Sequence, residues 1–410
     1  MWLLDRMLRR IVRKGELTVI EASGKSHRYG APDPDRAPVV IRFADAAAPN
    51  YIARNPRLGI GEVWMDGRVA IEQGDILALI SLIRSNAPWE RGGDGLRGST
   101  LKSTLGKLSG KIDRLNWERR SKRNVAHHYD LSDRLYDLFL DADRQYSCAY
   151  FTDPANGLEQ AQADKKAHIA AKLALKPGQR VLDIGCGWGG MALYLNRVAD
   201  VDVLGITLSE EQLKVARRRA EEAGVADRVK FELIDYRQLQ GRFDRIVSVG
   251  MFEHVGPPHY RRFFAKCRSL LAEDGVMLLH TIGRMGKPGV TDAFTAKYIF
   301  PGGYNPALSE IVAASEPSKL IAADIETLRL HYAYTLQHWY DRTVAAREAI
   351  EALYDARFYR LWIFYLAGAL SAFAHGGLCN YQIQYIRRRD TLPITRDYMS
   401  EAEAAFRARG

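Results

Sequence analysis

The segment DIGCGWGG at residues 183–190 constrains the fold of this chain more than any other part of the sequence. It follows directly after an apolar run and precedes a segment with a helical pattern. Glycines between a strand and a helix let the backbone turn tightly and approach a ligand at the start of the helix. The segment therefore predicts a strand–loop–helix unit of an open α/β sheet, with a ligand site above the loop.

Strand-like and helix-like segments alternate regularly from residue 177 onward. Apolar strands that alternate with helices predict the α/β class, with a mostly parallel sheet covered on both faces. Residues 291–350 are aromatic-rich and irregular, and the apolar run 361–374 predicts a core helix. That run is shorter than the roughly 20 residues needed to span a bilayer. The strand-like runs are residues 180–185, 201–207, 229–235, 243–250, 275–283 and 378–388.

The first hundred residues differ from the rest in pattern. Short apolar runs between residues 16 and 83 are separated by Gly, Pro and Asp, which predicts a small α/β module. Residues 85–110 are rich in Gly, Ser and charge and mark a boundary. We predict a small N-terminal domain over residues 1–95 that binds lipid or membrane, a basic linker over 96–125 and the main domain over 126–410.

The net charge of +10 implies attraction to an anionic partner, either nucleic acid or a phospholipid surface. Residues 101–123 carry eight basic and two acidic side chains, and residues 2–14 mix five basic side chains with apolar ones. The latter pattern fits a cationic amphipathic helix on a membrane and, equally, a surface helix packed on its own domain. No nucleic-acid reader motif accompanies the charge, so we expect no nucleic-acid partner.

The cysteines and the first residues point to the compartment. The four cysteines lie far apart with no CxxC pair, which favours a reducing environment over a disulfide framework or a zinc ribbon. The basic residues among the first 14 interrupt the apolar ones, so the start does not have the pattern of a secretory signal. We expect a cytoplasmic enzyme attached peripherally to the inner face of the membrane.

The glycine loop alone fits a dinucleotide, S-adenosylmethionine (AdoMet) or a turn that binds no ligand. Thr207 ends the second strand, where a nicotinamide enzyme usually has an acidic residue for the ribose, and this disfavours a dinucleotide. The spaced glycines, followed about 50 residues later by Asp235 and Tyr236 after a third strand, resemble class I AdoMet-dependent methyltransferases. That resemblance implies a Rossmann-like fold.

The same resemblance implies the residues that hold the cofactor. Gly185 and Gly187 make room for its methionine part, Thr207 and Gln212 lie near the ribose, and the Asp235–Tyr236 pair lies near the adenine. An exposed helix position remains the other interpretation of Gln212. The implied cofactor-binding residues are Tyr146, Ser147, Asp183, Gly185, Gly187, Thr207, Gln212, Asp235 and Tyr236.

A set of longer segments resembles the cyclopropane fatty acid synthase family, which includes mycolic acid cyclopropane synthases. The resemblance covers about residues 120–390. It implies helical insertions that form an acyl-chain pocket, and it makes residues 126–410 the catalytic domain. The segments are HHYDLSDRLYDLFLD (127–141), QYSCAYF (145–151), GMFEHVG (250–256), LLHTIG (278–283), KYIFPGGYNP (297–306) and HYAYTLQHWYDR (331–342).

The reaction that this family implies is transfer of the AdoMet methyl group to a cis double bond of a phospholipid acyl chain, followed by loss of a proton and ring closure. An activated methyl group needs alignment with the alkene rather than a nucleophilic side chain. The cationic intermediate needs a dry wall, for which aromatic faces are suited. Candidate wall residues are Tyr298, Phe300, Tyr304, Tyr332, Tyr334, Trp362, Phe364 and Tyr365. For each of them singly, core packing is the alternative interpretation.

A bicarbonate ion is the base that the resemblance implies. Its O–H can donate to a carboxylate while a histidine and a tyrosine donate to the ion. The implied catalytic residues are Cys148 through its backbone N–H, Glu253, His280, the main chain at Ile282, and Tyr332. The alternative product is a methylene or methyl-branched fatty acid, formed if the same cation loses its proton elsewhere or undergoes a hydride shift.

Several neighbouring residues receive no catalytic role. No base motif stands near Cys148, so covalent catalysis by its thiol is disfavoured. We expect His254 to face away from the site or to cap the following turn. We expect no metal, since His127 and His128 lack further ligands at metal spacing. The expected partners are a membrane phospholipid with an unsaturated acyl chain, an anionic membrane surface and a second copy of the chain in a homodimer.

Overall fold

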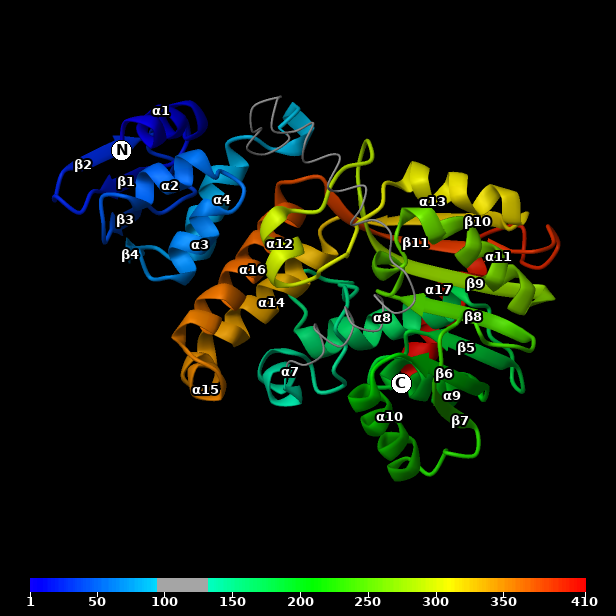
Figure 1. Ribbon diagram of the computed structural model, residues 1–410. Helices are drawn as coiled ribbons and strands as arrows, with labels where there is room; N and C mark the ends of the chain where they lie inside the picture. Colours follow the sequence, from blue (N-terminus) through cyan, green and yellow to red (C-terminus); the bar gives the residue numbers. More distant parts are fainter. Residues whose placement is uncertain (94–131) are drawn as a thin grey trace. The chain divides into compact units, whose positions relative to one another are not determined.

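The computed structural model describes residues 1–93 and 132–410, which belong to two compact units (Figure 1). The first unit combines the described part of Met1–Ser109 with Thr291–Pro301 and Leu336–Leu378. The second combines the described part of Gly110–Val290 with Gly302–Thr335 and Cys379–Gly410. Thr291–Pro301 and Leu336–Leu378, which fall in the predicted 126–410 domain, thus belong to the first unit. The functions assigned to the predicted domains stay predictions.

The first unit contains a four-stranded sheet of order β2-β1-β3-β4. Its longest helix, α16 (Ala356–Ala374), begins at Asp355, whose carboxylate accepts the Phe358 N–H at 2.6 Å. This helix contains the predicted core helix and packs against α3 (Gly59–Met65) and α4 (Ile76–Ser85). The other elements are α1 (Trp2–Ile11), β1 (Leu17–Ile20), β2 (Ser26–Tyr29), β3 (Val39–Phe43), α2 (Ala48–Arg54), β4 (Val69–Gln73), η1 (Trp89–Arg91), α12 (Ala293–Tyr298) and α15 (Arg347–Leu353).

The second unit is built on a seven-stranded sheet of order β10-β11-β9-β8-β5-β6-β7, in which β5 to β9 run parallel and β10 pairs antiparallel with β11. The predicted α/β class is confirmed, and each predicted run contains a strand. The strands are β5 (Arg180–Ile184), β6 (Asp202–Thr207), β7 (Val229–Leu233), β8 (Phe243–Val249), β9 (Leu271–Arg284), β10 (Ile321–Leu328) and β11 (Leu378–Ile386).

Strand β10 was not predicted from the sequence. It lies at the edge of the sheet, and five of its eight residues are exposed. Because an edge strand is only partly covered, it lacks the continuous apolar run that marks the central strands.

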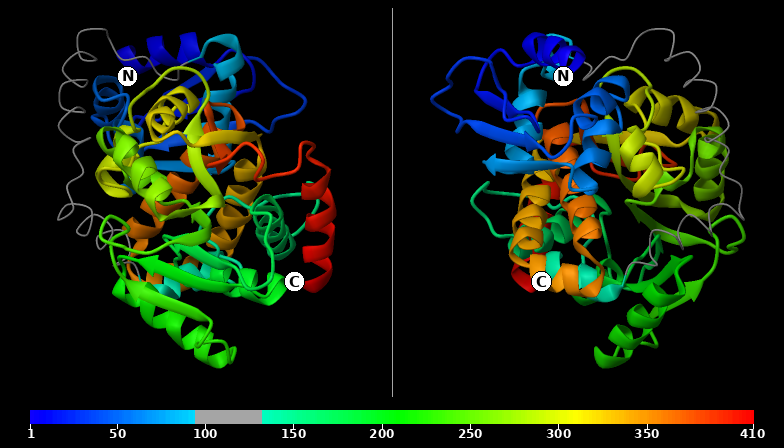
Figure 2. Two further views of the ribbon diagram at one scale, coloured as in Figure 1. Left: turned by 90° about the vertical axis from the view of Figure 1, so that its right-hand side faces the viewer. Right: turned by 60° about the vertical axis from the view of Figure 1, so that its left-hand side comes forward.

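Helices cover both faces of this sheet (Figures 1 and 2). Val181 of β5 belongs to a core with side chains of α8, α9, α10 and α17, whereas its neighbour Leu182 belongs to a core with side chains of α11 and α13. Successive strand residues thus feed opposite cores, as the pleat requires. The helices of this unit are α7 (Asp133–Phe139), α8 (Leu158–Lys172), α9 (Gly190–Ala199), α10 (Glu210–Glu222), η2 (Phe252–His254), η3 (Pro257–His259), α11 (Tyr260–Leu270), α13 (Leu308–Ser315), η4 (Glu316–Ser318) and α17 (Asp397–Arg409). Helix α14 (His331–Ala345) begins in this unit, and its residues from Leu336 onward belong to the first unit.

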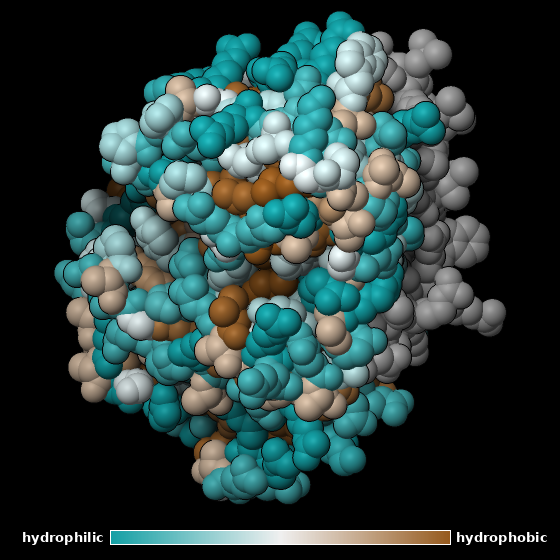
Figure 3. Space-filling model, turned by 90° about the vertical axis from the view of Figure 1, so that its left-hand side faces the viewer, coloured by the Kyte–Doolittle hydropathy of each residue, from teal (hydrophilic) through white to brown (hydrophobic). Residues whose placement is uncertain are grey.

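Helix α1 both packs on its own unit and presents apolar residues to solvent. Leu4 and Leu8 are buried, while the side chain of Trp2 is 72% exposed. The face shown in Figure 3 is mostly hydrophilic, with hydrophobic residues in separate patches. Across residues 1–93 and 132–410, no helix is long and apolar enough to cross a membrane.

Gly205 provides a test of the packing beneath the glycine loop. It lies opposite Phe231 in the β6–β7 register, and a Cβ there would lie 2.5 Å from the Phe231 ring. We expect Gly205→Ala to lower the free energy of unfolding by about 1–3 kcal/mol, the cost of overpacking a core. Phe231→Leu should relieve part of that loss in the double variant. Denaturant unfolding of the two single variants and the double variant measures this coupling, and strictly additive losses would contradict the packing argument.

Candidate active site

The glycine loop joins β5 to α9 at the carboxyl edge of the parallel strands. The N–H groups of Gly185 and Cys186 both donate to the Ile206 carbonyl, at 2.9 and 3.0 Å, which ties the loop to β6. Gly185 has φ +86°, and a Cβ there would meet the Met251 side chain at 2.9 Å. Gly187 has φ +55° with open space around its missing Cβ. The loop therefore needs glycine for its conformation and leaves its backbone open to a ligand.

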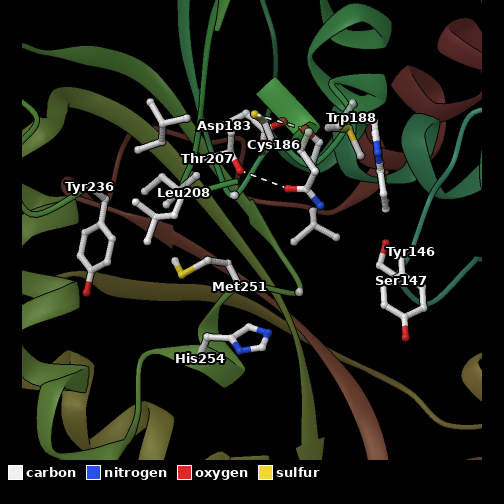
Figure 4. Close-up of a pocket in the computed structure, with 18 of the residues that line it drawn as sticks. Tyr146, Ser147, Asp183, Cys186, Trp188, Thr207, Leu208, Tyr236, Met251 and His254 are labelled. Carbon is white, nitrogen blue, oxygen red and sulfur yellow. Dashed lines mark hydrogen bonds between the residues drawn. The ribbon is translucent and has the colours of Figure 1, made fainter. Parts of the chain in front are cut away.

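A cavity lies over this loop, and residues that follow β5, β6, β7 and β8 line it together with residues 144–147 (Figure 4). All nine residues predicted to bind the cofactor line this single cavity, although they come from four separate parts of the chain. Sequence reasoning missed Trp188, Leu208, Met251 and His254, which also line it. All four residues follow closely after strands of the parallel sheet, and this position could have indicated that they line the cavity.

His254 corrects one expectation. It was predicted to face away from the site, yet its ring points into the cavity beside Met251 (Figure 4). The short helix η2 turns the chain directly after β8, and this turn aims His254 toward the glycine loop. Burial lowers the pKa of His254 to about 4, so the ring is neutral at physiological pH.

Asp183 lies in the floor of the cavity with an unsatisfied oxygen. Burial raises its pKa to about 7, against the opposing charge of Lys165. Its Oδ2 is buried and accepts no hydrogen bond from any described residue. Because an unpaired buried acceptor costs free energy, this oxygen is suited to a ligand group that donates.

Thr207 and Gln212 form a hydrogen-bonded pair at the rim. The Thr207 hydroxyl donates to Gln212 Oε1 at 3.1 Å, so the Gln212 side chain is buried rather than exposed on its helix (Figure 4). Asp235 is held differently, because Arg237 donates to both of its carboxylate oxygens. Tyr236 contacts Phe263 edge to face, with ring centroids 5.4 Å apart.

Two buried polar side chains of α8 fix the segment that carries Tyr146, Ser147 and Cys148. Gln162 donates to the carbonyls of Gln145 and Ser147, each at 3.1 Å. Lys165 is fully buried and donates to Gln145 Oε1 at 2.7 Å and to Ser147 Oγ at 2.9 Å. Burial lowers the pKa of Lys165 to about 8. These supports belong to a helix with no catalytic motif, so sequence reasoning did not find them.

The five predicted catalytic residues are joined in two groups. Ile282 donates its N–H to Glu253 Oε1 at 2.6 Å, and His280 precedes Ile282 by two residues on β9. The segment after Cys148 is bonded to the first turn of α14, which carries Tyr332. There the Ala149 N–H donates to Thr335 Oγ1 at 3.0 Å and the Phe151 N–H donates to His331 Nδ1 at 2.9 Å. None of the five lines the cofactor cavity itself, but their sequence neighbours Ser147, Met251 and His254 do.

Burial controls the ionisation of two of the predicted catalytic residues, Glu253 and Cys148. It raises the pKa of Glu253 to about 7, and Glu253 Oε2 is buried with no hydrogen bond to any described residue. Burial also raises the pKa of the Cys148 thiol, which keeps the sulfur protonated. A protonated thiol is a poor nucleophile, which agrees with the interpretation that only the backbone N–H of Cys148 is used.

His280 was predicted to donate a hydrogen bond to bicarbonate, and the structure shows which side chains surround its ring. Its ring nitrogens face two side-chain amides of β11, with Nε2 3.3 Å from Asn380 Nδ2 and Nδ1 3.1 Å from Gln382 Nε2. Burial lowers its pKa to about 3, so the ring is neutral. Donation from His280 to an anion therefore depends on which nitrogen carries the single proton.

The part of the chain that the structure describes contains no group of three or more His, Cys, Asp and Glu side chains placed to hold a metal ion. The predicted basic segment at 101–123 and the residues His127 and His128 lie outside the described residues.

A glycine loop of this geometry, a cavity over the carboxyl ends of parallel strands and an orphaned Asp183 oxygen in its floor fit AdoMet. The fold and the site define a class I AdoMet-dependent methyltransferase.

Comparisons with known proteins identify the family within this class. The sequence profile of the mycolic acid cyclopropane synthetase family matches residues 117–383, and the chain belongs to this family. It is 38% identical over 354 residues to the cyclopropane-fatty-acyl-phospholipid synthase of Escherichia coli K12, covering 86% of this chain and 88% of that protein. It is 42% identical over 293 residues to a "probable fatty acid methyltransferase" of Pseudomonas putida, covering 69% of this chain and 74% of that protein.

A solved structure agrees with the sequence comparisons. The mycolic acid cyclopropane synthase CmaA1, complexed with SAH and CTAB, superposes with a TM-score of 0.62 at 34% identity, covering 64% of this chain and 97% of that one. The chain is thus an AdoMet-dependent methyltransferase of the cyclopropane synthase type.

The raised pKa of Glu253 predicts how stability depends on pH. The folded carboxyl holds its proton up to about pH 7, whereas the unfolded one releases it near 4.5, so the residue progressively destabilises the fold between these values. Glu253→Gln removes this effect. We expect the variant's stability advantage to grow from pH 4.5 to 7 and then to level off, at a value on the order of 3 kcal/mol. Denaturant unfolding across this pH range measures it, and a pH-independent difference would contradict the assignment.

Proposed function

We propose that the protein is a cyclopropane-fatty-acyl-phospholipid synthase that methylates a cis double bond of a phospholipid acyl chain, with bicarbonate as the base that takes the proton before ring closure. AdoMet supplies an activated methyl group. The observation that carries the proposal is the buried Glu253 Oε2, which makes no hydrogen bond to another described residue and follows the cavity-lining residue Met251 by two positions.

This donor and acceptor set suits bicarbonate better than a plain anion. A carboxylate repels a fully deprotonated anion, but bicarbonate has one O–H that Glu253 Oε2 can accept. The Cys148 N–H, the Tyr332 hydroxyl and one nitrogen of His280 are the groups that we assign as donors to the ion. The role of Ile282 is to hold Glu253 Oε1 with its N–H and so leave Oε2 for the ion. A base held by hydrogen bonds can reach a proton that no side chain of this set reaches directly.

The aromatic residues predicted for a dry wall belong to both compact units, with one set in each. Phe300, Trp362 and Tyr365 lie together in the first unit, with centroid distances of 6.0 Å for Phe300–Tyr365 and 5.4 Å for Trp362–Tyr365. Phe294 and Phe364 of the same unit are 4.7 Å apart. Tyr304 and Tyr332 belong to the second unit, where the Tyr304 N–H donates to the Glu253 carbonyl at 2.9 Å. Tyr304 is thus bonded directly to a proposed catalytic residue.

Attachment to an anionic membrane surface is part of the proposal. Exposing an acyl chain to water costs about 0.8 kcal/mol per methylene. An enzyme that acts on such a chain therefore has to take it directly from the bilayer. Exposed Trp2 stands on α1 beside Arg6, whose guanidinium lies 5.9 Å from the centre of the indole. An amphipathic ring next to a cation is suited to the level of the lipid headgroups.

The reaction and its base are tested together. Purified protein is incubated with methyl-labelled AdoMet and vesicles of cis-monounsaturated phospholipid, and the fatty acid methyl esters are examined by mass spectrometry and proton NMR. We expect cyclopropane ring protons, a rate that falls when bicarbonate is depleted and recovers when it is restored, and a Glu253→Gln variant that binds AdoMet but loses most turnover. Vinylic methylene or branched-methyl signals would overturn the proposed product, and a rate indifferent to bicarbonate would overturn the proposed base.

The membrane contact is tested by vesicle sedimentation. We expect Trp2→Ser to weaken binding to vesicles that contain anionic lipid, and we expect binding to fall as salt rises, since the screening length shrinks from about 10 Å at 0.1 M to about 3 Å at 1 M. Ile394→Ser is the matched control, because it removes another exposed hydrophobic side chain, one that is 97% exposed. Equal binding by the wild type and Trp2→Ser would exclude α1 as the contact.

A further inference from the structure

The side chains around the neutral ring of His280 determine which of its two nitrogens carries the proton. A neutral imidazole has one N–H donor and one bare acceptor nitrogen, so a buried histidine can donate from only one side. His280 and Gln382 are each completely buried, and Asn380 is 1% exposed. The proton position is therefore set by these side chains and not by water.

Lys172 determines the orientation of the Gln382 amide. The Lys172 ammonium is 2% exposed and lies 2.9 Å from Gln382 Oε1. It also forms an ion pair with Glu326. An ammonium can only donate, so the amide oxygen of Gln382 has to face it. The Gln382 NH₂ group is then directed at His280, and Gln382 Nε2 lies 3.1 Å from His280 Nδ1.

The ion pair keeps this arrangement charged. Burial opposes ionisation of both partners, but hydrogen bonds and charge from His168 and Lys172 hold the pKa of Glu326 at about 2. His168 Nε2 lies 2.8 Å from Glu326 Oε2, and its Nδ1 lies 2.9 Å from Glu403 Oε2. Glu326 is therefore a carboxylate that holds Lys172 in its donating form.

We propose that Lys172 and Gln382 are positioning residues that fix His280 as the tautomer with a bare Nδ1 and a proton on Nε2. Because Gln382 donates to Nδ1, the single proton of the ring has to sit on Nε2, the nitrogen on the opposite side. This gives the neutral His280 the donor that an anion needs. The use of the Nε2–H group as a donor to bicarbonate rests on the proposed function. The tautomer itself does not depend on that function.

Asn380 supports the same proton position. Its Nδ2 lies 3.3 Å from His280 Nε2, which would bring two donors together, while its Oδ1 is buried and has no partner among the described residues. If the amide is turned by half a turn, Oδ1 accepts the Nε2 proton as long as no anion is bound, and a bound anion competes with Oδ1 for the same N–H. The rotation gives a partner to an oxygen that otherwise lacks one.

The tautomer is measured by NMR of protein labelled with ¹⁵N-histidine, with the His280 signals assigned from their loss in a His280→Gln variant. We expect Nδ1 without a proton and Nε2 with one in the wild type. Gln382→Glu places a carboxylate, which only accepts, against Nδ1, so we expect a proton on Nδ1. We expect turnover to fall about tenfold or more, with AdoMet affinity in calorimetry unchanged.

Gln384→Glu is the matched control, because it makes the same change two residues along the same face of β11, where the side chain donates to the Lys172 carbonyl and not to His280. It should leave the His280 tautomer as in the wild type. Lys172→Met is the second variant if Gln382→Glu does not fold, and it should populate both tautomers.

Three results would overturn the inference: a wild-type proton on Nδ1, a Gln382→Glu variant that loses turnover with its tautomer unchanged, and a reversed tautomer with full turnover. A wild type with the expected tautomer that makes no cyclopropane would instead overturn the proposed function and leave the tautomer assignment standing.

Discussion

The site depends on one physical constraint, which is that polar groups buried at the carboxyl edge of the sheet have to find partners. An unpaired buried donor or acceptor costs about 1–3 kcal/mol. Lys165 and Gln162 satisfy the Gln145–Ser147 segment, and Lys172 and Gln382 satisfy the ring of His280. Two of the buried oxygens that have no partner among the described residues, Asp183 Oδ2 and Glu253 Oε2, lie where we propose a cofactor and an ion.

Burial also sets the charges that the chemistry needs. It keeps His254 and His280 neutral and raises the pKa values of Asp183 and Glu253 to about 7. Cationic methylation chemistry in a dry site benefits from groups that change charge at little cost near neutral pH. Burial of Glu253 thus lowers the stability of the fold and, at the same time, provides the acceptor that we propose for bicarbonate.

Sequence reasoning succeeded where the signal is local. The glycine loop and the apolar runs of the central strands are each contained in a few residues, so the strands and the loop could be predicted directly. The nine residues that the family resemblance implied for the cofactor line one cavity, because parallel strands bring their carboxyl ends to one edge. It failed for β10, whose edge position removes the apolar run, and for His254, whose direction depends on the short helix η2. It also could not assign residues 291–301 and 336–378 to the first unit, because that assignment depends on packing between distant segments.

The sequence by itself determined the fold class, the glycine loop and the motifs of the family, because each of these is contained in short segments or in their order. Only the tertiary structure decided which side chains support the proposed catalytic ones. Gln382 is 102 residues from His280 and 210 from Lys172, and no periodicity or motif links positions so far apart. Adjacent strands and a covering helix bring them together in an interior without water, and there the donors and acceptors can be matched in one way only.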